Sequence, residues 1–131
     1  MCLIINTKYH HLRNGMPLAK IAKDDIPCYK LLIGGSHGWV TPFQCYNIKF
    51  KNGQCVQQSR IHPCMYTNGD FFITRGIHGF ISKGIYYLVG YRFNAIIPKG
   101  TRYYIGMHND MVSEKLIIYE DNYEKVNYTR K

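Results

Sequence analysis

Three basic side chains and two tyrosines near the end of the chain form the combination best suited to chemistry with an anion. Lys99, Arg102 and Lys115 can each pair with a phosphate, and the planar guanidinium of Arg102 matches phosphate geometry. Tyr103 and Tyr104 add flat rings on which a base can stack. We expect these residues to form an anion-binding site, and a solvated sheet face is the alternative.

Four further residues complete the expected ligand-binding set. Tyr29 and Lys30 precede the glycine-rich stretch 34–38, and Trp39 follows it. Backbone N–H groups in glycine-rich loops can cradle phosphates, and Trp39 offers a stacking face. His78 lies between glycines, where a histidine can contact a ligand phosphate. The alternatives are a plain surface loop, a core tryptophan and a structural histidine.

The sequence shows no catalytic signature, so we expect no catalytic residue, no cofactor and no metal. Carboxylates are scarce before the C-terminal tail, which disfavours hydrolases with paired carboxylates and carboxylate-bound metals. His62 and Cys64 form one closely spaced pair, whereas structural zinc sites use two. Loss of Met1 would leave Cys2 with the arrangement of an N-terminal nucleophile, but a small apolar residue that opens an edge strand is favoured.

The charge balance indicates an anionic partner. Seventeen Lys and Arg residues against eight Asp and Glu residues give a formal net charge of +9. This balance favours phosphates, nucleotides or nucleic acid, and generic solubility is the alternative. Five cysteines without paired spacing, no secretory signal and no apolar segment of bilayer length favour a reduced, cytoplasmic protein without a membrane partner.

The pattern of elements predicts an α+β fold, mainly antiparallel β, in a single compact domain that spans residues 1–131. One or two short helices are expected, in 17–24 and, as an alternative to a strand, in 85–89. Asn52-Gly53 predicts a hairpin, and 107–111 is expected to be a polar loop. The other expected elements are strands at 28–33, 91–97, 102–105 and 115–119 and a turn at 98–100.

Several short pieces resemble a family of short uncharacterised proteins that gut bacteria and their phages encode. The most distinctive piece is Ile97-Pro98-Lys99-Gly100-Thr101-x-Tyr103-Tyr104, and the likeness extends over most of the chain. Family members commonly follow the Gly-x-His-x-Phe piece with a helix, from which 82–87 departs here. The family brings no established activity. A phage origin implies a small defence-countering protein that acts in the host cytoplasm.

We therefore expect a small binding protein for a phosphate-bearing, nucleotide-like ligand, encoded by a phage and sequestering an immune signalling nucleotide. A weaker resemblance, of Tyr29-Lys30 and Gly76-Ile77-His78-Gly79-Phe80 to the strands of ADP-ribosyl-transferring folds, implies an alternative: an enzyme of that type, in which His78 and Glu114 would act. The other is a module that binds nucleic acid or protein. A homo-oligomer with its pocket at a subunit interface is also open.

Overall fold

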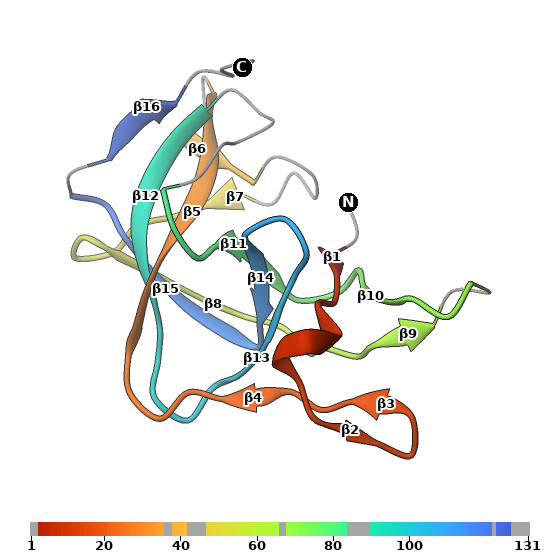
Figure 1. The fold of residues 1–131 in the computed structure, drawn as a ribbon. Coiled ribbons are helices and arrows are strands. Elements are labelled where there is room, and N and C mark those ends of the chain that lie inside the picture. Colours follow the sequence, from red (N-terminus) through yellow and green to blue (C-terminus); the bar gives the residue numbers. More distant parts are fainter. Residues whose placement is uncertain are drawn as a thin grey trace.

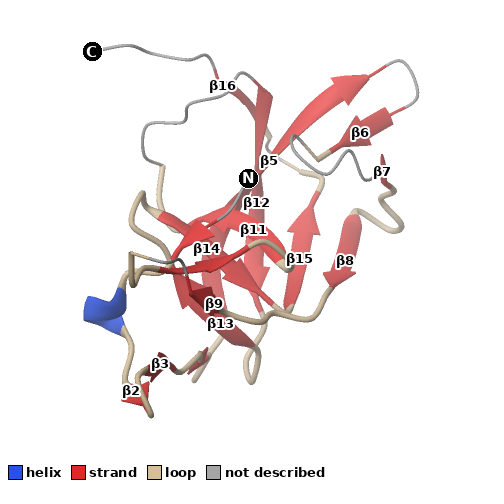
Figure 2. Cartoon of the chain, turned by 90° about the vertical axis from the view of Figure 1, so that its right-hand side faces the viewer, coloured by secondary structure: helices blue, strands red, loops and turns tan. Residues whose placement is uncertain are grey.

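The computed structural model describes residues 3–35, 38–41, 47–65, 68–83, 90–121 and 123–126, which form antiparallel β-sheet (Figure 1). The main sheet follows a path of eight strands, which in spatial order are β4 (Lys20–Ile21), β13 (Arg102–Ile105), β14 (Asp110–Ser113), β11 (Ile77–Phe80), β5 (Ile26–Gly35), β12 (Gly90–Ile97), β15 (Lys115–Tyr119) and β8 (Gln54–Gln58). Figure 2 shows β12, β15 and β8 following one another across this sheet.

Smaller strands extend the main sheet or pair beside it. In the extension, β6 (Gly38–Val40) pairs with β5, β7 (Asn47–Ile48) with β6, and β16 (Glu124–Val126) with β12. A second sheet has the order β1 (Leu3–Ile4), β10 (Phe71–Ile73), β9 (Cys64–Met65). The third is the hairpin of β2 (Leu12–Arg13) and β3 (Met16–Pro17).

The expected α+β fold with one or two short helices was wrong. The only helical segment in the described part of the chain is the three-residue 3-10 turn η1 (Thr7–Tyr9). Residues 17–24, expected to be helical, instead contain β4, which pairs with β13. Ladder hydrogen bonds to a neighbouring strand outweigh the modest helix preference of alanine and lysine in so short a segment. The second expected helix, 85–89, lies outside the described residues.

The core forms where the two longest strands pair. β5 and β12 lie side by side, in a register that runs from Tyr91 opposite Leu32 to Ile97 opposite Ile26 (Figure 1). Along β12, the side chains of Phe93, Ala95 and Ile97 are buried at alternate positions, as one face of a strand requires. They join residues of β5 and β15 in the larger of the two apolar clusters.

Strand β14 separates this cluster from a second one. All four residues of β14 are buried. Met111 and Val112, which are adjacent in this strand, belong to different clusters because successive side chains point to opposite faces. The second cluster gathers residues of β1 and β10.

A bend at Glu114 brings distant segments together. Glu114 alone separates β14, which pairs with β11 and β13, from β15, which pairs with β12 and β8. At the bend the Ser113 hydroxyl donates to the carbonyl of Lys115 over 2.9 Å. The Glu114 carbonyl accepts from Ser59 N–H at 2.9 Å, and Glu114 N–H donates to the Arg102 carbonyl at 3.0 Å. One residue therefore fixes the end of β8 and the start of β13 against the bend.

The expected Asn-Gly turn is present and sets the course of β8. Asn52 and Gly53 have φ of 55° and 78°, the left-handed values that such a hairpin turn needs, and Lys51 and Gln54 exchange backbone hydrogen bonds across it. From this turn β8 runs toward the bend at Glu114, paired with β15.

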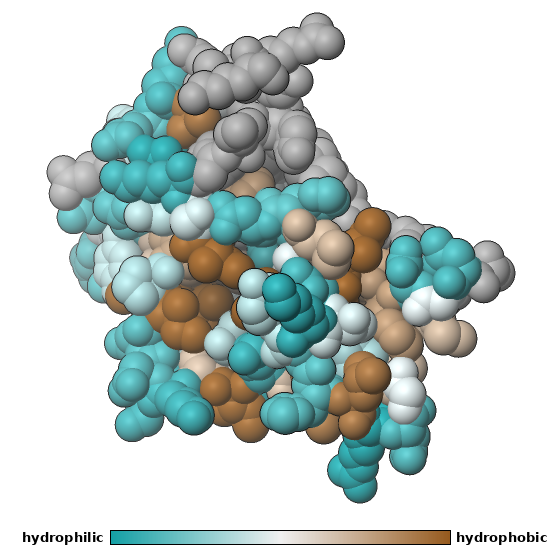
Figure 3. Space-filling model, in the orientation of Figure 1, coloured by the Kyte–Doolittle hydropathy of each residue, from teal (hydrophilic) through white to brown (hydrophobic). Residues whose placement is uncertain are grey.

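The surface of the described residues is mixed in character. Figure 3 shows apolar residues in separate small patches among hydrophilic ones on one face. Among the described residues there is no helix with the length and apolar character that a bilayer crossing requires.

Candidate anion-binding site

A groove opens to solvent at the bend. It is lined by residues 58–60, which end β8 and continue beyond it, by residues 100–102 at the start of β13, and by residues 114–115 of the bend itself. Its volume is about 490 Å³, within the range of small-ligand sites. We call this the basic groove, because three of its residues are Arg60, Arg102 and Lys115.

The charges in the basic groove favour an anion. Its lining includes three cationic residues and one carboxylate, that of Glu114. Arg102 Nε lies 3.4 Å from Glu114 Oε1, while 56% of the Arg102 side chain is exposed. The ion pair is formed through Nε, and the two terminal nitrogens of a guanidinium can make a bidentate contact to phosphate.

The structure brings together two of the three basic residues expected from the sequence. Arg102 and Lys115 line the basic groove, but Lys99 does not. Lys99 lies in the exposed turn before Gly100, and its backbone N–H donates to Asp25 Oδ1 over 2.9 Å. The residue missed is Arg60. It lies in a stretch without a recognisable element, so no pattern in the sequence connects it to Arg102.

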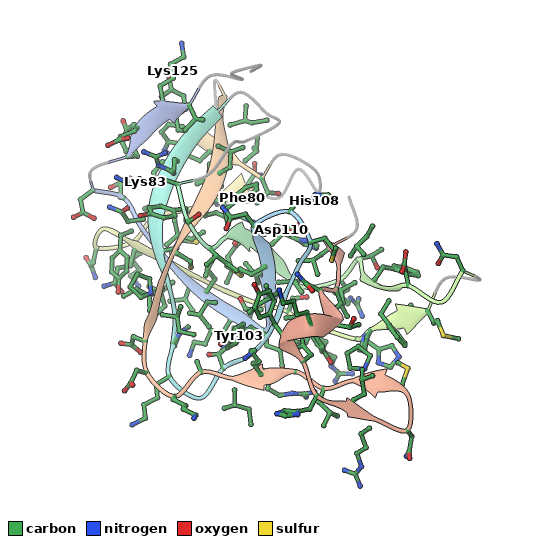
Figure 4. All side chains as sticks on the ribbon, in the orientation of Figure 1. Phe80, Lys83, Tyr103, His108, Asp110 and Lys125 are labelled. Atoms are coloured by element: carbon green, nitrogen blue, oxygen red, sulfur yellow. The ribbon has the colours of Figure 1, made fainter. Side chains whose placement is uncertain are left out.

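Neither tyrosine expected to stack on a ligand lies in the basic groove. Tyr104 is buried in the second cluster, where its hydroxyl donates to the Pro17 carbonyl over 3.0 Å and its ring lies 5.0 Å from that of His10. Tyr103 packs against the larger cluster, within the body of the fold and away from Lys125 at its far end (Figure 4). Burial raises the pKa of both phenols. Tyr104 therefore belongs to the core, and the half-buried Tyr103 packs against it.

Trp39 is half-buried and packs against the larger cluster. Its ring lies 5.0 Å from those of Tyr91 and Phe93 and 5.3 Å from that of Tyr123, each at a steep angle typical of edge contacts. This packing corresponds to the core alternative for Trp39. Residues 36–37 of the glycine-rich stretch lie outside the described residues.

Tyr29, Lys30 and His78 lie together on β5 and β11, apart from the lining of the basic groove. Lys30 is buried, and its Nζ donates to the His78 carbonyl over 2.5 Å. Burial lowers the pKa of Lys30 to about 8 and also lowers the pKa of His78, whose Nε2–H donates to the Thr74 carbonyl over 2.9 Å. The Arg92 guanidinium lies 5.6 Å from the centre of the Tyr29 ring.

The other groups that could carry chemistry are occupied elsewhere. Both ring nitrogens of His10 bond to the backbone, Nδ1–H to the Leu18 carbonyl and Nε2 from Ile105 N–H. Within the described ranges, no three His, Cys, Asp or Glu side chains gather closely enough to hold a metal ion. Glu114 pairs with Arg102 and His78 with Thr74, so the two residues of the ADP-ribosyl-transferring alternative have different partners. Cys2 lies outside the described residues.

Comparisons with protein-family models, curated proteins and solved structures find no match to this chain. The resemblance to short proteins of gut bacteria and phages stays a prediction.

Proposed function

We propose that this protein binds a small phosphate-bearing, nucleotide-like ligand in the basic groove. The observation that supports this proposal most is that Arg60, Arg102 and Lys115, which come from three separate segments, line one groove. Like charges repel one another when they lie close together, and an anion between them relieves that repulsion. Phosphate accepts several charge-assisted hydrogen bonds at once, which suits two arginines and a lysine.

In this proposal the ligand is held and not converted. The carboxylate of Glu114 is paired with Arg102, where it orients the guanidinium. A protein of this kind would act by sequestering its ligand, in keeping with the expected capture of a nucleotide signal.

The test is the binding of ADP and inorganic pyrophosphate, measured by calorimetry at low salt. In the double variant R60A/K115A we expect the affinity to fall about tenfold or more, because two hydrogen bonds to charged groups are lost. The matched control R13A/K125A removes two exposed charges outside the basic groove and should change the affinity less than about threefold.

Equal losses in the two double variants would mean that only the overall charge matters, which contradicts the proposal. A wild-type protein that binds a single-stranded oligonucleotide with a steep salt dependence, but neither ADP nor pyrophosphate, would also contradict it. That result would favour a nucleic-acid-binding module.

A further inference from the structure

Strand β8 forms an open edge of the main sheet. It pairs with β15 on one side, and no other strand in the described part of the chain pairs with it (Figure 2). It carries no charged residue and no proline, and Gln54, Val56 and Gln58 are exposed. Edge strands usually avoid pairing with a second molecule by being very short or by carrying a lysine, a proline or a bulge. At the opposite end of the path, β4 has only two residues and includes Lys20, so β8 is the end without such protection.

The open edge presents backbone groups that another strand can pair with. Ser59 N–H donates to the Glu114 carbonyl over 2.9 Å, so the backbone of Ser59 faces the bend and β15. Alternate residues of an antiparallel strand face the same neighbour. Gln57 therefore also faces β15, whereas Val56 and Gln58 direct their N–H and C=O groups away from it. Neither of these two residues has a backbone hydrogen bond to a described residue on the outer side.

The two ends of the open edge lie beside groups of opposite charge. At the C-terminal end of β8 lies the basic groove, where Arg60 is exposed. At the N-terminal end, a hollow of about 360 Å³ is lined by the turn 52–54 and by residues 119–121. We call it the acidic hollow, because its described lining includes the exposed carboxylates of Glu120 and Asp121 and no Lys or Arg. A second copy of β8 that runs antiparallel to the first would bring each basic end next to an acidic end.

We propose that β8 pairs antiparallel with β8 of a second copy of this chain, so that the main sheets of two copies form one sheet. This inference goes beyond the proposed function and does not depend on a ligand. With Val56 of one copy opposite Gln58 of the partner subunit, every outward N–H and C=O group of these two residues finds a partner, around a two-fold axis at Gln57. In this register Arg60 lies opposite Gln54 of the partner subunit, which lines the acidic hollow. The second copy therefore borders the basic groove.

Analytical ultracentrifugation at physiological salt, which screens the repulsion between two basic chains, tests this pairing. We expect the wild-type protein to sediment increasingly as a dimer as its concentration rises to about 0.5 mM. Val56→Pro removes an outward N–H and leaves the ladder with β15 intact, so it should weaken the dimer about tenfold or more, because symmetry removes two hydrogen bonds. The matched control Ile21→Pro changes an exposed residue of β4 whose backbone also faces outward, since Ala22 N–H donates to the Thr101 carbonyl, and should weaken the dimer less than about threefold.

A charge exchange tests the orientation of the two strands. Arg60→Glu and Glu120→Arg should each weaken the dimer about threefold, because each places like charges where the basic groove meets the acidic hollow. The double variant R60E/E120R restores opposite charges across the interface, so its dimer should be as tight as that of the wild type.

The outcomes separate this inference from the proposed function. A wild-type protein that stays monomeric over the whole range overturns the pairing, whether or not it binds ADP or pyrophosphate. A dimer that Val56→Pro and Ile21→Pro weaken equally would also overturn it, because its interface then lies away from β8. A double variant no tighter than Arg60→Glu alone would overturn the antiparallel arrangement. The wild-type measurement needs no variant, so it stands even if Val56→Pro does not fold.

Discussion

Replacing Phe93 with alanine is expected to lower the free energy of unfolding by about 3–5 kcal/mol, the usual loss for a large aromatic side chain in a core. Phe93 is fully buried on β12. Its ring stacks 4.8 Å from that of Tyr123 and 5.5 Å from that of Phe50, and it meets Trp39 edge-on. Several aromatic neighbours cannot all move into the space that one ring leaves, so most of the cavity persists.

Urea denaturation measures this loss, and Val56→Ala is its control. Val56 is 53% exposed on β8, so its truncation should cost less than about 1 kcal/mol. If Phe93→Ala and Val56→Ala have the same free energy of unfolding, the aromatic cluster around β12 is not the centre of the core.

Three strands of the main sheet could be predicted from the sequence, because local signals define them. The expected strands 102–105 and 115–119 match β13 and β15 residue for residue, and 91–97 differs from β12 by one residue. Each is an apolar or aromatic run that ends at a glycine, a proline or a polar residue. The helix expected in 17–24 is absent because this segment pairs as β4 with β13. That pairing depends on residues about eighty positions away, which local signals do not reveal.

The loop expected at 107–111 shows the same limit. Asn109 adopts φ of 62°, and Asp110 Oδ1 accepts from His108 N–H over 3.1 Å, so the chain reverses within a few residues (Figure 4). β14 therefore begins at Asp110, and Met111 is fully buried. Nothing in the composition of this polar stretch reveals that a fully buried strand begins at its end.

The residues of the candidate site also differ in whether the local sequence could predict them. Arg102 and Lys115 were expected to bind an anion because of their residue types, and they meet because Glu114 bonds to both Ser59 and Arg102. That bend also brings in Arg60, which no local pattern could select. The tyrosines beside Arg102 were misleading, because residues that suit stacking on a ligand suit packing in a β core equally well.

Lys30 is expected to make the stability of this protein rise with pH above about 8. The side chain is 6% exposed, and burial is the main cause that lowers its pKa from 10.5 to about 8, with Cys28 opposing that shift. In the unfolded chain the amine keeps its proton up to about pH 10.4. Below pH 8 both states are protonated, and the folded state bears the full cost of a buried charge. Between about pH 8 and 10 the folded state releases the proton first, so stability increases.

The comparison with Lys30→Met isolates this effect. Methionine fills a similar volume without a charge, so this variant should lack the rise in stability that the lysine causes. We expect the free energy of unfolding of the wild type, relative to Lys30→Met, to increase by roughly 1 kcal/mol between pH 8 and pH 9. Burial raises the pKa of Cys28 to about 12, and this thiol is present in both proteins, so its contribution cancels in the difference to first order.

Urea titrations at pH 7, 8 and 9 measure the difference, and Lys125→Met serves as the control at an exposed position of β16. The free energy of unfolding of Lys125→Met, plotted against pH, should run parallel to that of the wild type. A parallel curve for Lys30→Met as well would mean that Lys30 keeps its proton when folded over this range. In that case its Nζ has access to water, and Lys30 returns to the set of residues able to meet an anionic ligand. A rise of the wild type relative to Lys30→Met means that the Lys30 amine loses its proton within the folded interior over this range.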